Sequence, residues 1–310
     1  MEIIASDPAG IARAVEQLKA GGLIALPTET VYGLGADARD GKAVAAIYHA
    51  KGRPSFNPLI IHVADLETAL QYAEVGEHAR LLAKTFWPGA LTLVLPLKAQ
   101  SGLSSLVTAG LDTVAVRIPA HPVAQSILRA FNGPVAAPSA NPSGRISATT
   151  AAHVAAGLAG ADVLVLDAGR SDIGLESTII AAGDPPTLLR AGGIAAEKIE
   201  AALGQKLALP EVGKITAPGQ LSSHYAPRAA LRLNATQFRE DEVSLGFGAM
   251  AATRNLSPQG DLLEAAANLF DHLHQLDEMS APIAVAPIPE NGLGRAINDR
   301  LRRAAAPRGR

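Results

Sequence analysis

The chain has 310 residues, of which 48% are hydrophobic and only 4% aromatic, and its formal net charge is −2. This length fits one large domain or two ordinary ones, and the aliphatic-rich composition favours an α/β protein. A charge so close to zero excludes a global field that would draw the chain to nucleic acid, and the lack of cysteine excludes thiol nucleophiles, zinc–thiolate sites and disulfides. The N-terminus has no signal-peptide pattern and no apolar run reaches the length of a membrane span, so we expect a cytoplasmic protein with no membrane partner.

Helices and strands alternate over the first two hundred residues. Ser6 or Asp7 is a candidate cap for a helix with Pro8 in its first turn, and Asp40 is the expected cap of the helix that starts at Gly41. Several connections are too short for helical crossovers, which predicts mixed strand directions. Strands are predicted at 23–26, 59–63, 91–95, 114–118, 135–137, 163–166, 178–180 and 187–189, and helices at 8–20, from 41, and at 66–72, 77–87, 122–130, 151–156 and 195–203.

The periodicity disappears between residues 204 and 227, where proline and glycine recur among small and polar residues. This pattern predicts an interdomain linker. A second alternating unit follows in β-β-α-β-α order, with strands at 231–233, 243–247 and 283–286 and helices at 262–276 and from 293. We therefore predict a first domain at 1–204, a linker at 205–228 and a small α/β domain at 229–310.

The segment from residue 23 to residue 54 is the most informative one. An apolar strand ends at Pro27 and is followed by a loop with two hydroxyls, a carboxylate and a phenol, at Thr28, Glu29, Thr30 and Tyr32. Gly33 and Gly35 are expected to let this loop turn tightly. Lys51 and Arg53 come at the end of the next helix, and Pro54 and Pro58 stiffen the chain around them. Hydroxyls facing a fixed pair of cations predict a small anionic substrate.

Other predicted strands also end in polar side chains. Arg117 ends one strand, where it either pairs with a neighbouring carboxylate or holds a substrate carboxylate in a bidentate contact. Ser139 and Asn141 follow one further strand, Ser177 comes directly before another, and Arg190 comes directly after a third. Ligands of open α/β sheets bind beyond strand ends, so we expect these loops to converge on one crevice.

Together these motifs resemble those of the threonylcarbamoyl-AMP synthases. The resemblance rests on the loop 27–35, Lys51-x-Arg53-Pro with Asn57-Pro-Leu, Ser139-x-Asn141 with Ser147, and Glu176-Ser177-Thr178. The segment Pro218-Gly219 to His224-Tyr225-Ala226-Pro227 and the ending Gly-Leu-Gly-Arg295 to Arg300 resemble the two-domain form. The resemblance implies a YrdC-like N-terminal domain, built on a twisted, open, mixed sheet with a large cavity, and a small Rossmann-like C-terminal domain.

It also implies a reaction in which L-threonine, bicarbonate and ATP, with Mg²⁺ on the phosphates, give L-threonylcarbamoyladenylate and pyrophosphate. The product then feeds the transferase machinery that modifies the tRNA adenosine beside the anticodon. The implied threonine site is Thr30, His62, Arg117, the backbone around Ala137, and Ser177. The implied ATP site is Lys51, Arg53, Asn57, Thr113, Ser139, Asn141, Ser147, Arg190 and Tyr225, with Lys51 and Arg53 as the catalytic cations and unidentified Mg²⁺ ligands. The 205–228 segment would be a lid; simple interdomain packing of His224-Tyr225 is the alternative.

Two other functions compete with this one. Carbamoyl-transferring maturation proteins share the catalytic domain, but they carry cysteine-rich zinc modules, which this chain lacks. An RNA-binding module without catalysis would use the arginines of the C-terminus, and a weak contact with tRNA, binding it as double-stranded RNA, is the corresponding prediction. The alternative is that these arginines form the solvated face of a terminal helix whose Ile297 and Leu301 pack inward. They are Arg295, Arg300, Arg302, Arg303, Arg308 and Arg310.

Overall fold

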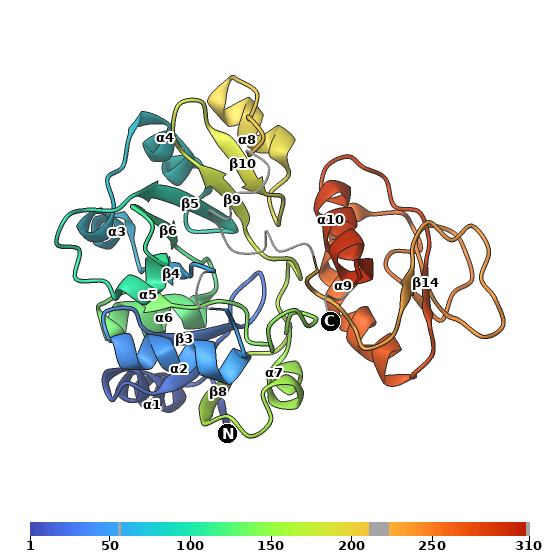
Figure 1. Ribbon diagram of the computed structural model, residues 1–310, viewed down its shortest axis with the longest axis horizontal. Coiled ribbons are helices and arrows are strands. Elements are labelled where there is room, and N and C mark those ends of the chain that lie inside the picture. Colours follow the sequence, from blue (N-terminus) through green and yellow to red (C-terminus); the bar gives the residue numbers. More distant parts are fainter. Residues whose placement is uncertain (55–56, 211–222, 308–310) are drawn as a thin grey trace.

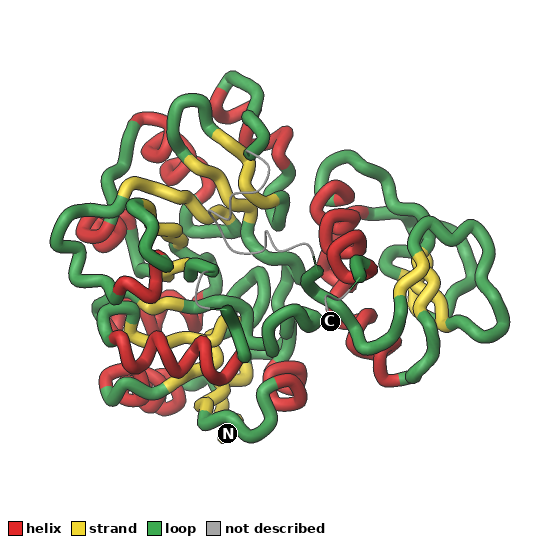
Figure 2. Tube along the Cα trace, viewed as in Figure 1, coloured by secondary structure: helices red, strands yellow, loops and turns green. Residues whose placement is uncertain are grey.

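The computed structural model describes residues 1–54, 57–210 and 223–307. It has two sheets, a ten-stranded sheet in the N-terminal part of the chain and a four-stranded sheet in the C-terminal part (Figures 1 and 2). We call the parts that hold these sheets the N-terminal unit and the C-terminal unit. The strands of the larger sheet are β1 (Glu2–Ala5), β2 (Leu23–Leu26), β3 (Gly33–Asp37), β4 (Ile60–His62), β5 (Leu91–Pro96), β6 (Thr113–Arg117), β7 (Val135–Ala136), β8 (Val163–Asp167), β9 (Thr178–Ala181) and β10 (Thr187–Arg190).

The larger sheet is mixed, as the short connections predict. Its strand order is β1-β8-β2-β3-β7-β4-β6-β5-β9-β10. The pairs β1–β8, β2–β8, β4–β6 and β5–β9 are parallel, and the other neighbours are antiparallel. The register His62↔Arg117 and Thr92↔Arg117 sets three polar side chains side by side on neighbouring strands.

Helices pack on both faces of this sheet, and the alternation of side chains along β2 shows why. Leu23 and Ala25 belong to one buried cluster, with the helices α2 to α4. Ile24 and Leu26 point to the opposite face and pack against α1 and α6. The helices of this unit are α1 (Pro8–Lys19), α2 (Gly41–Lys51), α3 (Leu66–Tyr72), α4 (Glu77–Phe86), α5 (Ser105–Thr108), α6 (Pro122–Phe131), α7 (Ala151–Gly157) and α8 (Ala196–Leu203).

Local signals set the helix ends near the site. The side chain of Asp7 caps α1 at Gly10 N, and that of Asp40 caps α2 at Lys42 N and Ala43 N, as predicted. Helix α2 ends at Gly52, which has a φ of 57° in the left-handed region. Lys51 is therefore the last residue of the helix, and Arg53 follows directly after the turn.

The prediction of a tight turn at Gly33 and Gly35 was wrong. Both residues lie in β3, which pairs antiparallel with β2 in the register Ile24↔Gly35 and Leu26↔Gly33. A Cβ at Gly33 would lie 3.1 Å from Cβ of Ala137, and one at Gly35 would lie 3.0 Å from Val135 Cγ1. The glycines therefore allow β3 to pack closely against β7 and against Ala137, which follows β7.

The C-terminal unit is a small parallel α/β fold. Its sheet has the order β11-β14-β12-β13, and every pair is parallel. Its elements are β11 (Leu231–Arg232), β12 (Val243–Gly246), β13 (Arg254–Asn255), α9 (Leu262–Glu278), β14 (Ile283–Val285) and α10 (Gly294–Ala305). The predicted α/β fold class is thus confirmed for both units, while β13, like β1, β3 and α5, was not predicted.

The two units share an interface formed by α9 and α10 (Figure 1). The buried cluster of the C-terminal unit includes Val31, Ile146 and Leu175 of the N-terminal unit. At its edge the rings of His153 and His274 stack with centroids 3.9 Å apart. Half of the predicted 205–228 linker, residues 211–222 with Pro218-Gly219, lies outside the described residues.

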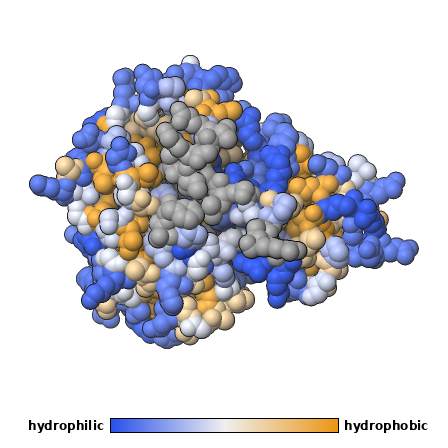
Figure 3. All heavy atoms as spheres, in the orientation of Figure 1, coloured by the Kyte–Doolittle hydropathy of each residue, from blue (hydrophilic) through white to orange (hydrophobic). Residues whose placement is uncertain are grey.

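Hydrophobic side chains on the face shown in Figure 3 form scattered patches among hydrophilic ones. Within the described ranges, none of the helices has the length and apolar character needed to cross a membrane.

Candidate functional site

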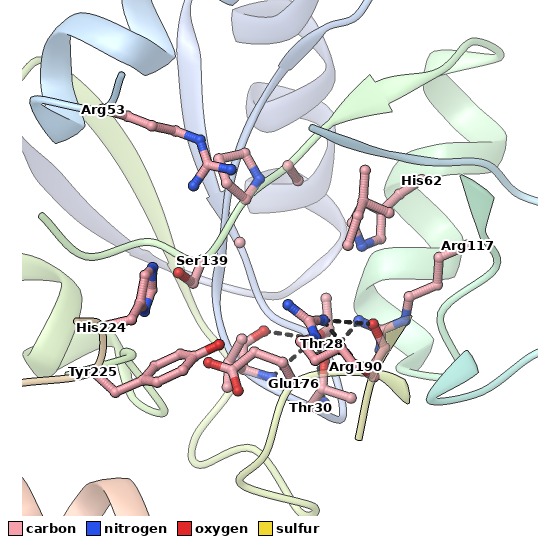
Figure 4. A pocket seen from close by; sticks show the side chains of 16 residues that line it. Thr28, Thr30, Arg53, His62, Arg117, Ser139, Glu176, Arg190, His224 and Tyr225 are labelled. Carbon is pink, nitrogen blue, oxygen red and sulfur yellow. Dashed lines mark hydrogen bonds between the residues drawn. The ribbon is translucent and has the colours of Figure 1, made fainter. Parts of the chain in front are cut away.

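A cavity in the N-terminal unit brings the predicted loops together (Figure 4). It contains about 550 Å³ of empty space, including its mouth. The polar strand ends and the loop after β2 form its wall. His224 and Tyr225, which follow α8 in the sequence, also line it. The predicted site residues that line it are Thr30, Arg53, His62, Arg117, Ala137, Ser139, Ser177, Arg190 and Tyr225.

The remaining predicted site residues lie behind or beside this wall. Lys51 Nζ donates to the carbonyl oxygens of Ser139, at 2.5 Å, and Asn141. Ser147 Oγ donates to Glu176, which does line the cavity. Thr113 lies on the same face of β6 as Arg117, four residues before it, outside the lining of the cavity.

Asn57 is fully enclosed and lies directly before Pro58. Its side-chain Oδ1 and Nδ2 are buried and have no hydrogen-bond partner among the described residues. An unpaired buried amide is costly unless a ligand satisfies it. Asn57 is therefore well suited to contact a bound ligand.

Arg117 anchors one end of the cavity. Its Nη2 donates to Glu29 Oε1 and its Nη1 to Thr30 Oγ1, both at 2.7 Å, while Nε donates to Gly89 O at 3.2 Å. The structure shows the predicted ion pair with a neighbouring carboxylate, and the bidentate contact with a substrate carboxylate stays a prediction. Burial raises the pKa of Glu29, but the charge and hydrogen bond of Arg117 outweigh it, so the pKa lies below its ordinary value. This end of the cavity holds a charged pair and a hydroxyl.

The hydroxyl loop is held by its own hydrogen bonds. Thr28 Oγ1 donates to Val31 O at 2.5 Å and lies 2.9 Å from Thr30 Oγ1. The phenol of Tyr32 donates to Gly169 O at 2.7 Å, away from the cavity. Thr28 and Thr30 line the cavity, whereas the phenol of Tyr32 bonds to the backbone at Ala168 and Gly169.

His62 lies beside Arg117 on the neighbouring strand and is 3% exposed. Burial and the charge of Arg117 lower its pKa to about 3. Its Nδ1 has no hydrogen-bond partner among the described residues. His62 is thus a neutral imidazole at neutral pH, with one nitrogen available to a ligand.

This histidine predicts a pH dependence of stability. The unfolded state binds its proton below about pH 6.5, whereas the folded state does not, so the free energy of unfolding falls as the pH drops below that value. The contribution is about 1.4 kcal/mol per pH unit. The free energy of unfolding can be measured by urea unfolding at about pH 6 and at about pH 5. Between these two pH values it should fall by about 1.4 kcal/mol less in His62→Gln than in the unsubstituted protein. Equal decreases in the two proteins would show that His62 is not held neutral.

Arg53 lies at the opposite end of the cavity from Arg117 (Figure 4). Its Nε and Nη2 donate to the carbonyl oxygens of Asn57, at 3.3 Å, and Pro58, at 3.0 Å. Although it is only 8% exposed, it has no carboxylate partner among the described residues. Burial lowers its pKa to about 10, and burial together with the charge of Arg53 lowers the pKa of Lys51 well below its ordinary value. Arg53 is thus a buried cation that no carboxylate of the described ranges neutralises, which favours binding of an anion here.

Arg190 and Ser177 form a third part of the wall. Arg190 Nε and Nη2 donate to Ser177 O at 3.1 and 2.9 Å, and Nη2 also lies 3.1 Å from Ser177 Oγ. Thr92 Oγ1 lies 2.7 Å from the same hydroxyl. This network fixes Ser177 between β5 and β10.

Sequence reasoning missed several residues of this site. Glu29 and Glu176 belong to the motifs that resemble the family, but neither was predicted to have a role. His224 was predicted only to belong to a lid or to an interdomain contact. The two alternatives for Arg300, a contact with RNA phosphate or a solvated helix face, were both wrong, because Arg300 is 0% exposed and paired with Glu176. The other described C-terminal arginines are ion-paired, Arg295 with Glu197, Arg302 with Glu290 and Arg303 with Asp299; Arg308 and Arg310 lie outside the described residues.

Comparison with known proteins identifies the family. Residues 16–192 match the Sua5/YciO/YrdC family model, described as telomere recombination, and residues 194–306 match the model described as the threonylcarbamoyl-AMP synthase C-terminal domain. The chain belongs to the threonylcarbamoyl-AMP synthase family. The synthase of Bacillus subtilis is 41% identical over 99% of this chain and 96% of its own, and that of Pyrococcus abyssi is 42% identical over 94% and 92%.

A solved structure of this family supports the same conclusion, and a second solved structure shares the fold of one unit. The crystal structure of P. abyssi Sua5 complexed with L-threonine has a TM-score of 0.90 at 39% identity and covers 98% of both chains. Escherichia coli YciO shares the fold of the N-terminal unit, with a TM-score of 0.53 at 24% identity over 61% of this chain and 94% of its own. The two-domain architecture predicted from the resemblance is therefore that of the threonylcarbamoyl-AMP synthases.

Proposed function

We propose that this chain is a nucleotidyltransferase that converts L-threonine, bicarbonate and ATP into L-threonylcarbamoyladenylate and pyrophosphate. The observation that carries the proposal is the difference in charge between the two ends of the cavity. One end holds the Arg117–Glu29 pair with Thr30 and neutral His62, and the other holds Arg53, a buried cation without a carboxylate partner in the described part of the chain. The crystallised P. abyssi relative with L-threonine supports an amino acid as one substrate.

L-Threonine would occupy the Arg117 end. Arg117 would bind its carboxylate and Thr30 its hydroxyl, with the backbone at Ala137 and the hydroxyl of Ser177 also lining this cavity. A neutral His62 accepts a hydrogen bond without adding positive charge near the substrate amine. The ammonium group of L-threonine first loses a proton to solvent. The free amine then attacks the carbon of bicarbonate, and water leaves, to give an N-carboxy-threonine that carries two negative charges.

ATP would occupy the Arg53 end. An oxygen of the new carbamate group of the N-carboxy-threonine attacks the α-phosphorus, and the bond from phosphorus to the pyrophosphate oxygen breaks, so that pyrophosphate leaves. Two like unit charges 4 Å apart repel by about 4 kcal/mol at the effective dielectric of such a site. Lys51, Arg53 and Arg190 would offset this repulsion, so that catalysis consists of positioning and electrostatic stabilisation. Asn57, Thr113, Ser139, Asn141, Ser147 and Tyr225 complete the proposed nucleotide site.

We propose that Mg²⁺ accompanies ATP on its phosphate oxygens, where it would neutralise part of the triphosphate charge. Across the described ranges, no group of three or more His, Asp or Glu side chains is placed to hold a metal ion. We also propose that the product is consumed in the cytoplasm by the transferase machinery that modifies the tRNA adenosine beside the anticodon.

The test is pyrophosphate release by the purified protein with ATP, Mg²⁺, bicarbonate and L-threonine, each omitted in turn. We expect release only when threonine and bicarbonate are both present, because the attacking carboxylate is made from both. Release that is indifferent to threonine would contradict the proposal.

A further inference from the structure

Arg300 is a side chain of the C-terminal unit that is buried against the cavity wall of the N-terminal unit. It lies on α10 and is 0% exposed. Its Nε donates to Glu176 Oε2 and its Nη1 to Asp299 Oδ2, both at 2.8 Å. Its guanidinium carbon lies 4.9 Å from the centroid of the Tyr225 ring. Arg300 thus contacts two residues that line the cavity.

Glu176 links Arg300 to the predicted nucleotide site. Its second oxygen, Oε1, accepts a hydrogen bond from Ser147 Oγ at 2.5 Å. Burial raises its pKa, but the positive charges of Arg300 and Arg190 and the hydrogen bonds from Ser147 and Arg300 lower the pKa below its ordinary value. Both carboxylate oxygens are therefore occupied, and Glu176 is fixed between Ser147 and Arg300.

Helix α10 also holds Tyr225. This residue has a φ of 61°, a conformation that aromatic side chains rarely adopt and that the surroundings must enforce. Arg300 lies over one side of its ring, and the backbone N–H of the preceding His224 donates to Arg303 O at 3.2 Å. The following Ala226 N donates to Gly144 O at 2.8 Å. The C-terminal unit thus contributes directly to the placement of Tyr225.

We propose that Arg300 is a positioning residue of the active site, through which the C-terminal unit fixes Glu176 and Tyr225 at the nucleotide end of the cavity. This inference rests on the proposed function. An apolar side chain of similar volume would stabilise the interface as well as a buried ion pair does, so packing alone gives no reason for a guanidinium here. Arg300 Nη2 also lacks a hydrogen-bond partner among the described residues. Burying this unpaired donor costs free energy, which packing alone does not explain.

The test compares Arg300→Met and Arg300→Lys with Arg302→Met, a matched control on the exposed side of the same helix. KM values for ATP and for L-threonine are measured separately. We expect Arg300→Met to raise the KM for ATP by at least about tenfold, and up to about 100-fold, because misplacement of positioning groups has effects of this size. The KM for L-threonine should stay within about twofold, since Arg117 is unaffected, and the control should match the unsubstituted protein. Arg300→Lys keeps the charge but not the planar fork, so it should give an intermediate effect.

The double variant Arg300→Met/Glu176→Gln separates positioning from folding. Glutamine still accepts from Ser147 but leaves no buried unpaired charge, so the double variant should recover part of the ATP affinity lost in Arg300→Met. If Arg300→Met does not fold, Arg300→Lys and the double variant provide the comparison. An unchanged KM for ATP, or equal losses for ATP and L-threonine, would overturn the inference. Failure of the unsubstituted protein to release pyrophosphate would instead overturn the proposed function.

Discussion

Replacing Arg117 by methionine should lower the free energy of unfolding by about 3–5 kcal/mol and abolish binding of L-threonine. The substitution leaves Glu29 buried and unpaired, and the loss of one partner of a buried ion pair has this cost. It also removes the donor to Thr30 Oγ1. Chemical unfolding and calorimetric titration with L-threonine measure the two effects independently.

The double variant Glu29→Gln/Arg117→Met is the control for that result. Without a buried carboxylate to pair, it should recover most of the stability that Arg117→Met loses. It should still fail to bind L-threonine, because the guanidinium is absent. Recovery of threonine binding in the double variant would show that Arg117 acts only through the stability of the fold.

Replacing Arg53 by methionine should strongly lower turnover and should lower the free energy of unfolding less than Arg117→Met does. Arg53 donates to two carbonyl oxygens and has no carboxylate partner among the described residues, so its removal leaves no unpaired charge. We expect the free energy of unfolding to fall by about 1–3 kcal/mol, because the buried Pro58 O loses its donor. Turnover should fall by about 100- to 1,000-fold, as it does when one preorganised electrostatic group is removed from an active site.

Lys42→Met provides the comparison for Arg53→Met. Lys42 is an exposed cation in the first turn of α2, the helix that ends just before Arg53, and its removal changes the net charge equally. Its turnover should equal that of the unsubstituted protein. Full activity in Arg53→Met, or equal losses in both variants, would rule out a direct contact between Arg53 and the phosphates.

The sequence predicts local structure well wherever one segment is sufficient to determine it. Asp7 and Asp40 have the short polar side chains that cap helices, and both do so. Strand β2 was predicted with its observed bounds because a short aliphatic run ends at proline. Strand β3 was missed because glycine favours turns, and only its pairing with β2 and β7 makes Gly33 and Gly35 strand residues.

The site depends on long-range contacts that periodicity does not contain. Arg117 and Glu29 are 88 residues apart, and Arg300 and Glu176 are 124 apart. Arg300 follows Ile297 by three positions and so lies on the inward face of α10, yet a charged residue is ordinarily expected to face solvent. Its burial follows from the position of Glu176, which no pattern within the helix reveals.

The most direct test of the account is identification of the product made from ¹³C-labelled bicarbonate. The purified protein is incubated with ATP, Mg²⁺, L-threonine and the labelled bicarbonate, and the nucleotides are separated and analysed by mass spectrometry. We predict a threonylcarbamoyl adenylate in which the carbamoyl carbon is labelled, formed in equal amount to pyrophosphate. An adenylate without the label, or AMP and pyrophosphate formed equally well without threonine, would contradict it.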